Sequence, residues 1–141
     1  MVIFKVEEVK RRLQTDSVAG LSAQLIGRKG SGFGGTILYE GSQKESCVFV
    51  SLSGRGRGIK PHRHKGREEI YVILDGWGEM LVGDETCEVV KGDVVFVPVD
   101  TAHGLRNLGD IPLDALVFTA PPFDDTDRTP EQEESLPSQW R

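Results

Sequence analysis

Long apolar runs are missing from this 141-residue sequence. No stretch approaches the roughly 20 residues that a membrane-spanning helix needs. The first residues, MVIFKVEEVKRRLQ, also lack the continuous apolar segment of a secretory signal. We therefore expect a cytoplasmic protein that does not engage a membrane.

Cysteine is also rare, and the 22 acidic residues outnumber the 17 Lys and Arg residues. The two cysteines, Cys47 and Cys87, lie in separate strand-like runs without metal-ligand spacing, so free thiols are expected, although a disulfide stays open. The formal net charge is −5. Because a nucleic-acid-binding face needs an excess of Lys and Arg, this balance argues against nucleic acid as a partner.

Histidine is scarce as well, and its placement is ordered. The chain has three histidines, His62, His64 and His103, and a carboxylate, Glu69, stands between the second and the third. Three neutral imidazoles and one carboxylate suit Mn, Fe, Co, Ni, Cu or Zn, and the set alone does not choose among them. The pattern predicts one divalent transition-metal site.

Strand geometry supports this interpretation. Successive side chains of a strand alternate between its faces, so His62 and His64 should point the same way and Arg63 the opposite way. The polar residues 65–68 read as a turn, and a hairpin there would return Glu69 beside the two histidines. His103 follows the β-branched run 94–98, so it should come from a separate strand.

The rest of the chain indicates an all-β domain. Its length suits one domain with a core and is too short for two ordinary ones. It has 17 glycines and 7 prolines, which separate short apolar runs. The strand candidates are GTILY, SCVFVSL, EEIYVIL, GEMLV, CEVV, DVVFV and LDALVF, with a compact hairpin around residues 82–85. The glycine-rich stretch 27–35 is expected to form a flexible connection or a lid over a barrel mouth.

Two segments carry a family resemblance. GRGIKPHRHKGREEIYVILDG has the form G-x5-H-x-H-x4-E-x6-G, and GDVVFVPVDTAHGLRN has the form G-x5-P-x4-H-x3-N. Together they resemble the paired motifs of the cupin superfamily. The resemblance implies an antiparallel double-stranded β-helix, or jelly-roll barrel, that usually holds a divalent transition metal. It places the ligands at His62, His64, Glu69 and His103.

The match departs from the family pattern at one position. Asp100 stands where the family commonly has glycine, and aspartate tolerates turn conformations, so the loop into His103 should change little. Glu68 is a rival to Glu69, but only Glu69 leaves six residues before Gly76. The 15 residues between Gly76 and Gly92 and the lack of an internal repeat resemble the smaller, single-barrel members.

We divide the chain into a barrel domain over residues 1–120, with its motif core at 56–107, and an acidic, proline-containing tail over 121–141. Residues 2–14 should lead in as a strand or a helical turn. The tail should be extended, with Phe123 and Trp140 available to pin parts of it to the barrel or to a neighbouring subunit. Since the family commonly pairs barrels through edge strands, we expect a homodimer in which residues 2–9 cross over.

Side-chain alternation also predicts which residues line the pocket. Lys60 and Tyr71 are the candidate catalytic residues, and Ile73, Leu105 and Asn107 should share their face. Lys60 would attract a carboxylate or phosphate, unless Pro61 bends the strand and turns it to solvent. Tyr71 would donate a hydrogen bond or carry a proton; the alternative is an aromatic core residue.

The resemblance implies action on a small polar molecule, anionic or polyhydroxylated. Sugar phosphate isomerase-like, oxalate decarboxylase-like and dioxygenase-like chemistry are all within reach, because fold does not choose among them. The alternative is a non-catalytic module that binds a sugar or a small acid. Tyr71 or Lys60 inside the pocket would favour an enzyme, and an apolar lining would favour binding alone.

Overall fold

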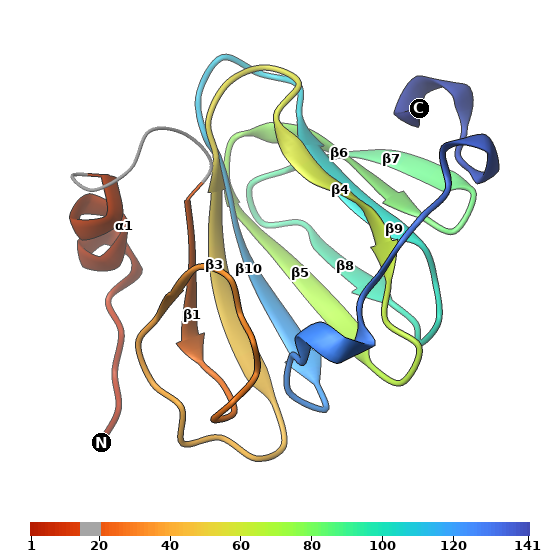
Figure 1. Cartoon of the computed structure of the whole chain (residues 1–141). Coiled ribbons are helices and arrows are strands. Elements are labelled where there is room, and N and C mark those ends of the chain that lie inside the picture. Colours follow the sequence, from red (N-terminus) through yellow and green to blue (C-terminus); the bar gives the residue numbers. More distant parts are fainter. Residues whose placement is uncertain (15–20) are drawn as a thin grey trace.

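Two facing β-sheets form a jelly-roll barrel in the computed structural model, which describes residues 1–14 and 21–141 (Figure 1). This confirms the all-β barrel. The first sheet has the order β2 (Thr36–Ile37), β1 (Leu21–Ile26), β3 (Ser46–Leu52), β10 (Leu113–Ala120), β5 (Glu68–Asp75), β8 (Val94–Val97). The second has the order β11 (Thr129–Pro130), β4 (Gly58–Arg63), β9 (His103–Asn107), β6 (Trp77–Val82), β7 (Glu85–Val90).

The core lies between the sheets because the strands alternate buried and exposed side chains. In β5, for example, Tyr71 and Ile73 are buried and Ile70 is exposed. Side chains from both sheets meet in one apolar cluster, which includes Val48, Val50, Leu52, Tyr71, Ile73, Met80, Val89, Val97, Leu105, Leu113, Ala115 and Val117. Period-two patterning therefore places the apolar faces of the two sheets against each other.

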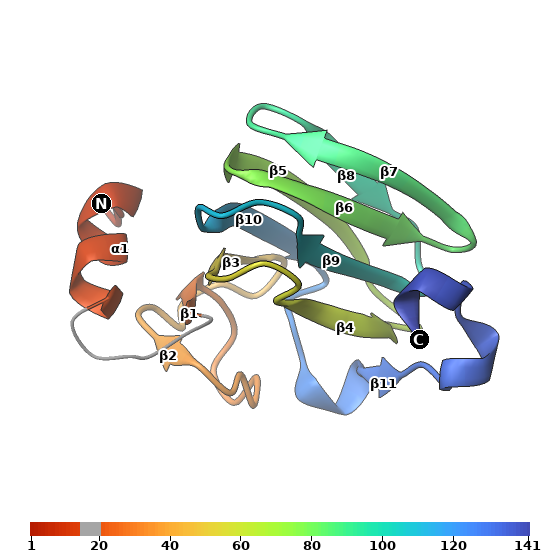
Figure 2. The ribbon, with the colours of Figure 1, turned by 90° about the horizontal axis from the view of Figure 1, so that it is seen from above.

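Residues 6–14 form a helix, α1 (Val6–Gln14), on the outer face of the first sheet (Figure 2). Val9 and Leu13 are buried there with Phe49 and neighbouring side chains of β1 and β3. Lys10 Nζ donates to Asp114 Oδ2 at 2.6 Å. Residues 6–14 are thus helical, and this helix packs on the sheet of its own chain. Within the described residues, no helix is long and apolar enough to cross a membrane.

Two turns match their predictions. β6 and β7 form a hairpin in which Val82 pairs with Glu85, and Gly83 takes a φ of 64° in the two-residue turn. Asp100 has a φ of 51°, the left-handed conformation that glycine would adopt most readily and that aspartate tolerates. Asp100 therefore takes a turn conformation without glycine at this position.

The connection from β4 to β5 differs from the expected hairpin. β4 pairs with β9 and β11 in one sheet, whereas β5 pairs with β10 and β8 in the other. Residues 64–67 therefore cross from one sheet to the other. The change of sheet, and not strand pairing, brings Glu69 opposite the histidines inside the barrel.

The tail beyond residue 120 is irregular, as expected, but it is packed against the barrel along part of its length. β11 pairs with β4, and three short 3-10 turns accompany it: η1 (Asp125–Asp127), η2 (Glu133–Ser135) and η3 (Ser138–Trp140). Leu136 and Trp140 are buried with Leu81. The guanidinium carbon of Arg106 lies over the Trp140 ring, 4.7 Å from the ring centroid. Phe123 and Trp140 both anchor the tail, in line with the sequence.

Phe49→Ala tests the packing of α1 on the sheet. Phe49 is fully buried between the helix and the sheet, so its loss should lower the free energy of unfolding by about 3–5 kcal/mol through lost burial and a cavity. Urea denaturation followed by circular dichroism measures this. Phe49→Leu, which retains most of the volume, should lose clearly less, and equal losses would contradict this packing.

Candidate metal centre

Four side chains from three strands and one connecting loop meet inside the barrel. His62 lies near the end of β4, His64 follows it, Glu69 lies near the start of β5, and His103 begins β9. One ligand atom from each lies within 4.8 Å of all the others, and all four residues are buried. The structure thus brings together the complete set that the spacing predicts, with Glu69 in it and Glu68 exposed on the opposite face.

Each imidazole is fixed through its Nδ1 atom. A backbone carbonyl can only accept, so each Nδ1 must carry the proton and donate it. The acceptors are the Lys60 carbonyl for His62 at 2.8 Å, the Asp127 carbonyl for His64 at 2.5 Å and the Thr101 carbonyl for His103 at 2.9 Å. Each ring, in its neutral form, therefore presents the lone pair of Nε2 to the centre of the cluster.

The centre contains acceptors without a donor. Glu69 Oε1 lies 2.8 Å from His103 Nε2 and 3.4 Å from His64 Nε2. Neither Glu69 Oε1 nor His103 Nε2 has a hydrogen bond, although both atoms are buried. Two ligands held about 2.1 Å from an ion are at most about 4.2 Å apart, so only small shifts would close the cluster around a metal. A divalent cation fits this donor set.

Thr119 orients the carboxylate of Glu69. Its hydroxyl donates to Glu69 Oε2 at 2.5 Å, and the two residues face each other across β10 and β5. Burial by itself would raise the pKa of Glu69, but the adjacent His103 and His64 more than offset burial and hold the pKa well below its usual range. Glu69 is therefore ionised, with Oε2 occupied by Thr119 and Oε1 free for a cation.

The pKa values of His62 and His64 shift in opposite directions. Burial, and then the proximity of His103, lowers the pKa of His62 to about 3. Burial acts in the same direction on His64, but its contact with the Glu69 carboxylate and the Asp127 carbonyl raises its pKa overall. His62 is thus neutral across the physiological range, as a metal ligand would need to be. A proton on His64 and a metal ion would satisfy the same need for positive charge, so the two should compete.

The C-terminal tail supplies part of this centre. Besides its carbonyl, Asp127 uses its carboxylate to accept from the amides of Lys65 (2.8 Å) and Gly66 (3.0 Å), and from Arg67 Nη1 (2.8 Å). Phe123 stacks edge-on against His64, with ring centroids 6.1 Å apart. The tail therefore holds the turn that carries His64.

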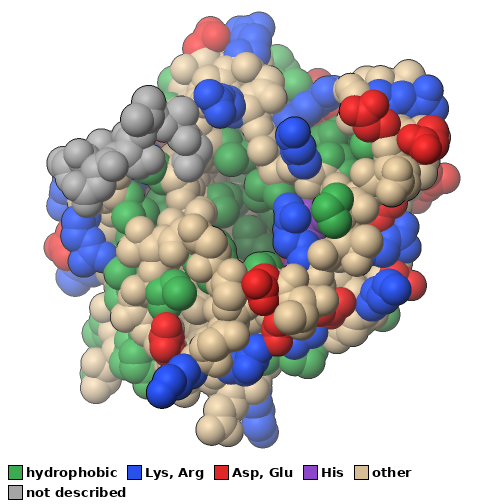
Figure 3. All heavy atoms as spheres, viewed as in Figure 1, with side chains coloured by type: hydrophobic (Ala, Val, Ile, Leu, Met, Phe, Trp, Pro, Cys, Tyr) green, Lys and Arg blue, Asp and Glu red, His purple; other side chains and the backbone are tan. Residues whose placement is uncertain are grey.

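A cavity of about 380 Å³ opens between the sheets beside the cluster. Figure 3 shows the hollow, with hydrophobic side chains on its floor and a histidine beside Lys or Arg at one edge. Its walls are mainly apolar, and its polar residues include His62, His64, Glu69, Tyr71, Thr119, Asp125 and Arg128. The cavity has the size and mixed character of a small-molecule site.

The glycine-rich loop lies at the mouth of this cavity. Gly32, Gly34 and Gly35 line it together with Phe33, whose ring meets Phe123 edge-on at 5.7 Å. Gly32 has a φ of 72°, and a Cβ there would collide with the carboxylate of Asp125. Glycine is thus required at this position, and the loop lies where a lid would lie.

The family model described as "Cupin domain" matches residues 48–119, about half of the chain. The chain belongs to the cupin family. An uncharacterized protein of Methanocaldococcus jannaschii is 42% identical over 66 residues, which cover 47% of this chain and 53% of that protein. An oxalate-binding protein of Thermotoga maritima is 33% identical over 61 residues, which cover 43% and 50%. The chain thus spans about half the length of these two relatives.

A solved structure agrees over more of the chain. The protein TT1209 of Thermus thermophilus superposes with a TM-score of 0.65 at 26% identity, over 86% of this chain and 98% of that one. The agreement extends well beyond the motif core at 56–107. This cupin therefore shares its overall architecture with that protein.

Tyr71 lies in the cavity as expected. It is 2% exposed, and its ring centroid is 6.0 Å from that of His103. Burial, followed by the charge of Glu69, raises the pKa of Tyr71 well above its usual value, so the phenol stays protonated. It belongs to the core cluster and also lines the cavity.

Lys60 does not share the face of His62, which corrects the sequence interpretation. Ile59 pairs with Leu105 and His62 with His103, so three steps along β4 oppose two along β9. This bulge, next to Pro61, reverses the alternation. Ile59 consequently lines the cavity, whereas Lys60 is exposed and is not among the lining residues.

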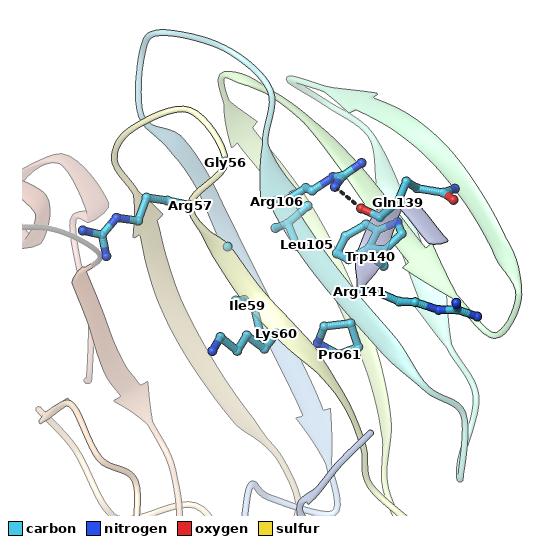
Figure 4. Close-up of a pocket in the computed structure, with 11 residues that line it drawn as sticks. Gly56, Arg57, Ile59, Lys60, Pro61, Leu105, Arg106, Gln139, Trp140 and Arg141 are labelled. Atoms are coloured by element: carbon cyan, nitrogen blue, oxygen red, sulfur yellow. Dashed lines mark hydrogen bonds between the residues drawn. The ribbon is translucent and has the colours of Figure 1, made fainter. Parts of the chain in front are cut away.

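Lys60 borders instead a second depression, of about 320 Å³, between β4, β9 and the C-terminal turn (Figure 4). Arg57 and Lys60 extend there away from Trp140, and Arg141 extends in another direction (Figure 4). Arg106 is already paired with Glu79 at 2.7 Å. The cations of this depression diverge, so they do not form a convergent anion site.

Sequence reasoning missed three contributors: Thr119, Asp127 and Arg128. Thr119 had a detectable signal, because it continues the inward face of Ala115 and Val117 along β10. Asp127 acts through its backbone carbonyl, which residue type does not reveal. Arg128 belongs to a tail without periodicity, so no pattern placed it at the cavity.

Thr119→Val should weaken metal binding by about tenfold to a hundredfold, because Glu69 loses the hydroxyl that orients it while the side-chain shape is kept. Competition with a chromogenic chelator gives the affinity. Thr86→Val, on the exposed face of β7, is the matched control and should bind as the unaltered protein does. Equal affinities of the two variants would show that the Thr119 hydroxyl does not support metal binding.

Proposed function

We propose that this cupin binds one divalent transition metal, Mn, Fe, Co, Ni, Cu or Zn, through His62, His64, Glu69 and His103, and uses it to act on a small polar, anionic molecule. The observation that carries this proposal is the meeting of three Nε2 atoms and one carboxylate oxygen without a buried donor among them. Buried acceptors without a donor are costly unless a cation joins them.

The bound metal and the side chains that line the cavity would have different roles. A metal in this cluster would polarise an oxygen of the ligand as a Lewis acid. Tyr71, neutral and facing the cavity, would donate a hydrogen bond to a ligand oxygen. Phe33 and Phe123 would cover the mouth and limit the access of water to the ligand.

Relatives support a small anion as the ligand. One is named for oxalate binding. Another, a glucose-6-phosphate isomerase of Pyrococcus abyssi, is 37% identical over 87 residues that cover 41% of its length. Both names refer to small anionic molecules. Decarboxylase-like, isomerase-like and dioxygenase-like reactions are the candidate activities for this site.

A non-catalytic binding module is the second candidate. The mainly apolar wall of the cavity favours it: apart from the metal-ligand candidates His62, His64 and Glu69, the buried polar side chains among the described lining residues are Tyr71 and Thr119, and the Thr119 hydroxyl already donates to Glu69. Incubating the metal-loaded protein with oxalate and with sugar phosphates separates the two candidates. Conversion of a ligand supports an enzyme, and binding without conversion supports the module.

Glu69→Gln tests the metal site against a neighbouring carboxylate. Loss of the buried charge should lower the metal content after replenishment from about one ion per chain to well below half, because the substitution removes the anionic ligand. Glu68→Gln removes an exposed charge from the adjacent position and should leave one ion bound. Elemental analysis of both variants, purified without an affinity tag, measures the difference; unchanged metal in Glu69→Gln contradicts the assignment.

We also propose a homodimer, formed through the part of the first sheet that α1 leaves uncovered. Phe118, Ile70 and Phe96 lie side by side across β10, β5 and β8, and all three are exposed. An apolar row of this kind suits contact with a second copy. Because Val9 packs on its own sheet, the N-terminal segment is not needed for this contact.

Phe96→Glu should convert the dimer to a monomer, because it would bury a charge in an apolar contact. Light scattering at micromolar concentration gives the molar mass. Ile111→Glu, an exposed apolar residue outside the row, is the control and should leave the dimer intact. A monomeric unaltered protein would refute the proposed assembly.

A further inference from the structure

The tail places one cation at the cavity. Arg128 follows Asp127, whose carboxylate is bound by the 65–67 turn, and precedes Thr129, which pairs with Arg63 in β4. Its backbone is thus fixed on both sides. The Arg128 side chain lines the cavity together with His62 and Tyr71.

Arg128 is uncommitted, unlike the other arginines around it. Arg28, Arg63, Arg67 and Arg106 each form an ion pair with a carboxylate. Arg128 has no ion pair or side-chain hydrogen bond with any residue in the described ranges 1–14 and 21–141. Its charge nevertheless reaches the cavity interior, where it contributes to lowering the pKa of His62 and opposes the rise at Tyr71.

We propose that Arg128 is a specificity-determining residue that binds a carboxylate of the ligand, while an oxygen at the ligand's other end reaches the His62, His64, Glu69 and His103 cluster. This deepens the proposed function and rests on it. A guanidinium offers two parallel N–H donors that match the two oxygens of a carboxylate. The favoured ligands are therefore short organic acids with a second oxygen function, dicarboxylates among them.

The rim of the cavity carries a negative charge as well as the positive charge of Arg128. Asp125 also lines it and has no ion pair in the described part of the chain. A nearby carboxylate weakens any general attraction for anions. Affinity then depends on direct pairing with Arg128, so the separation between the two ends of the ligand decides which acid binds.

The test compares diacids with their monoamides, which keep the shape and lose one charge. Oxalate and oxamate, malonate and malonamate, and succinate and succinamate are titrated calorimetrically into metal-loaded protein. For at least one of the three carbon-chain lengths, the unaltered protein should bind the diacid about tenfold more tightly than the monoamide, because the single carboxylate of a monoamide binds the doubly charged metal and leaves a neutral amide facing Arg128. Arg128→Gln should reduce this ratio to near one, and Arg128→Lys should restore part of it.

Arg57→Gln is the control, since Arg57 is exposed, borders the outer depression and does not line the cavity; it should keep the full ratio. Metal content is measured on every variant, because its loss in the unaltered protein counts against the proposed function and not against Arg128. An unchanged ratio in metal-loaded Arg128→Gln would overturn the role of Arg128. Failure of every diacid to bind the metal-loaded protein would overturn the ligand class.

Discussion

The structure depends on three hydrogen bonds in which an imidazole Nδ1–H donates to a backbone carbonyl. These bonds fix the rotation and tautomer of His62, His64 and His103, and they leave the Nε2 lone pairs facing one carboxylate. Without them the rings could pair with Glu69 as ordinary donors, and the cluster would need no further cation. The carbonyls thus turn a group of buried polar residues into a site that requires positive charge.

The same constraint joins distant parts of the chain. Two of the carbonyls lie two residues before their own histidine, whereas the third belongs to Asp127, far along the sequence in the tail. The jelly roll supplies the rest, because β4 and β9 carry histidines in one sheet while β5 and β10 hold Glu69 and Thr119 in the other. The centre therefore spans both sheets and the tail, and its geometry depends on the whole fold.

Much of the fold followed from the sequence, because period-two apolar runs and glycine-marked turns act locally. Spacing likewise singled out His62, His64, Glu69 and His103. Alternation failed at Lys60, because a bulge beside Pro61 shifts the register by one. Pro61 indicated that the strand could bend, but a proline alone does not fix where the register shifts. The role of the tail was not predictable either, because it acts through a backbone carbonyl and through Arg128, in a segment without periodicity.

Anomalous diffraction from crystals of the metal-loaded protein tests the central claim most directly. Data collected on both sides of the absorption edge of the bound metal locate the ion without assumptions about its ligands. The account predicts one peak per chain, about 2.0–2.2 Å from Nε2 of each of the three histidines and from Oε1 of Glu69. A peak at the Nδ1 atoms, a peak at the acidic residues 124–127 instead, or no peak between the sheets would contradict it.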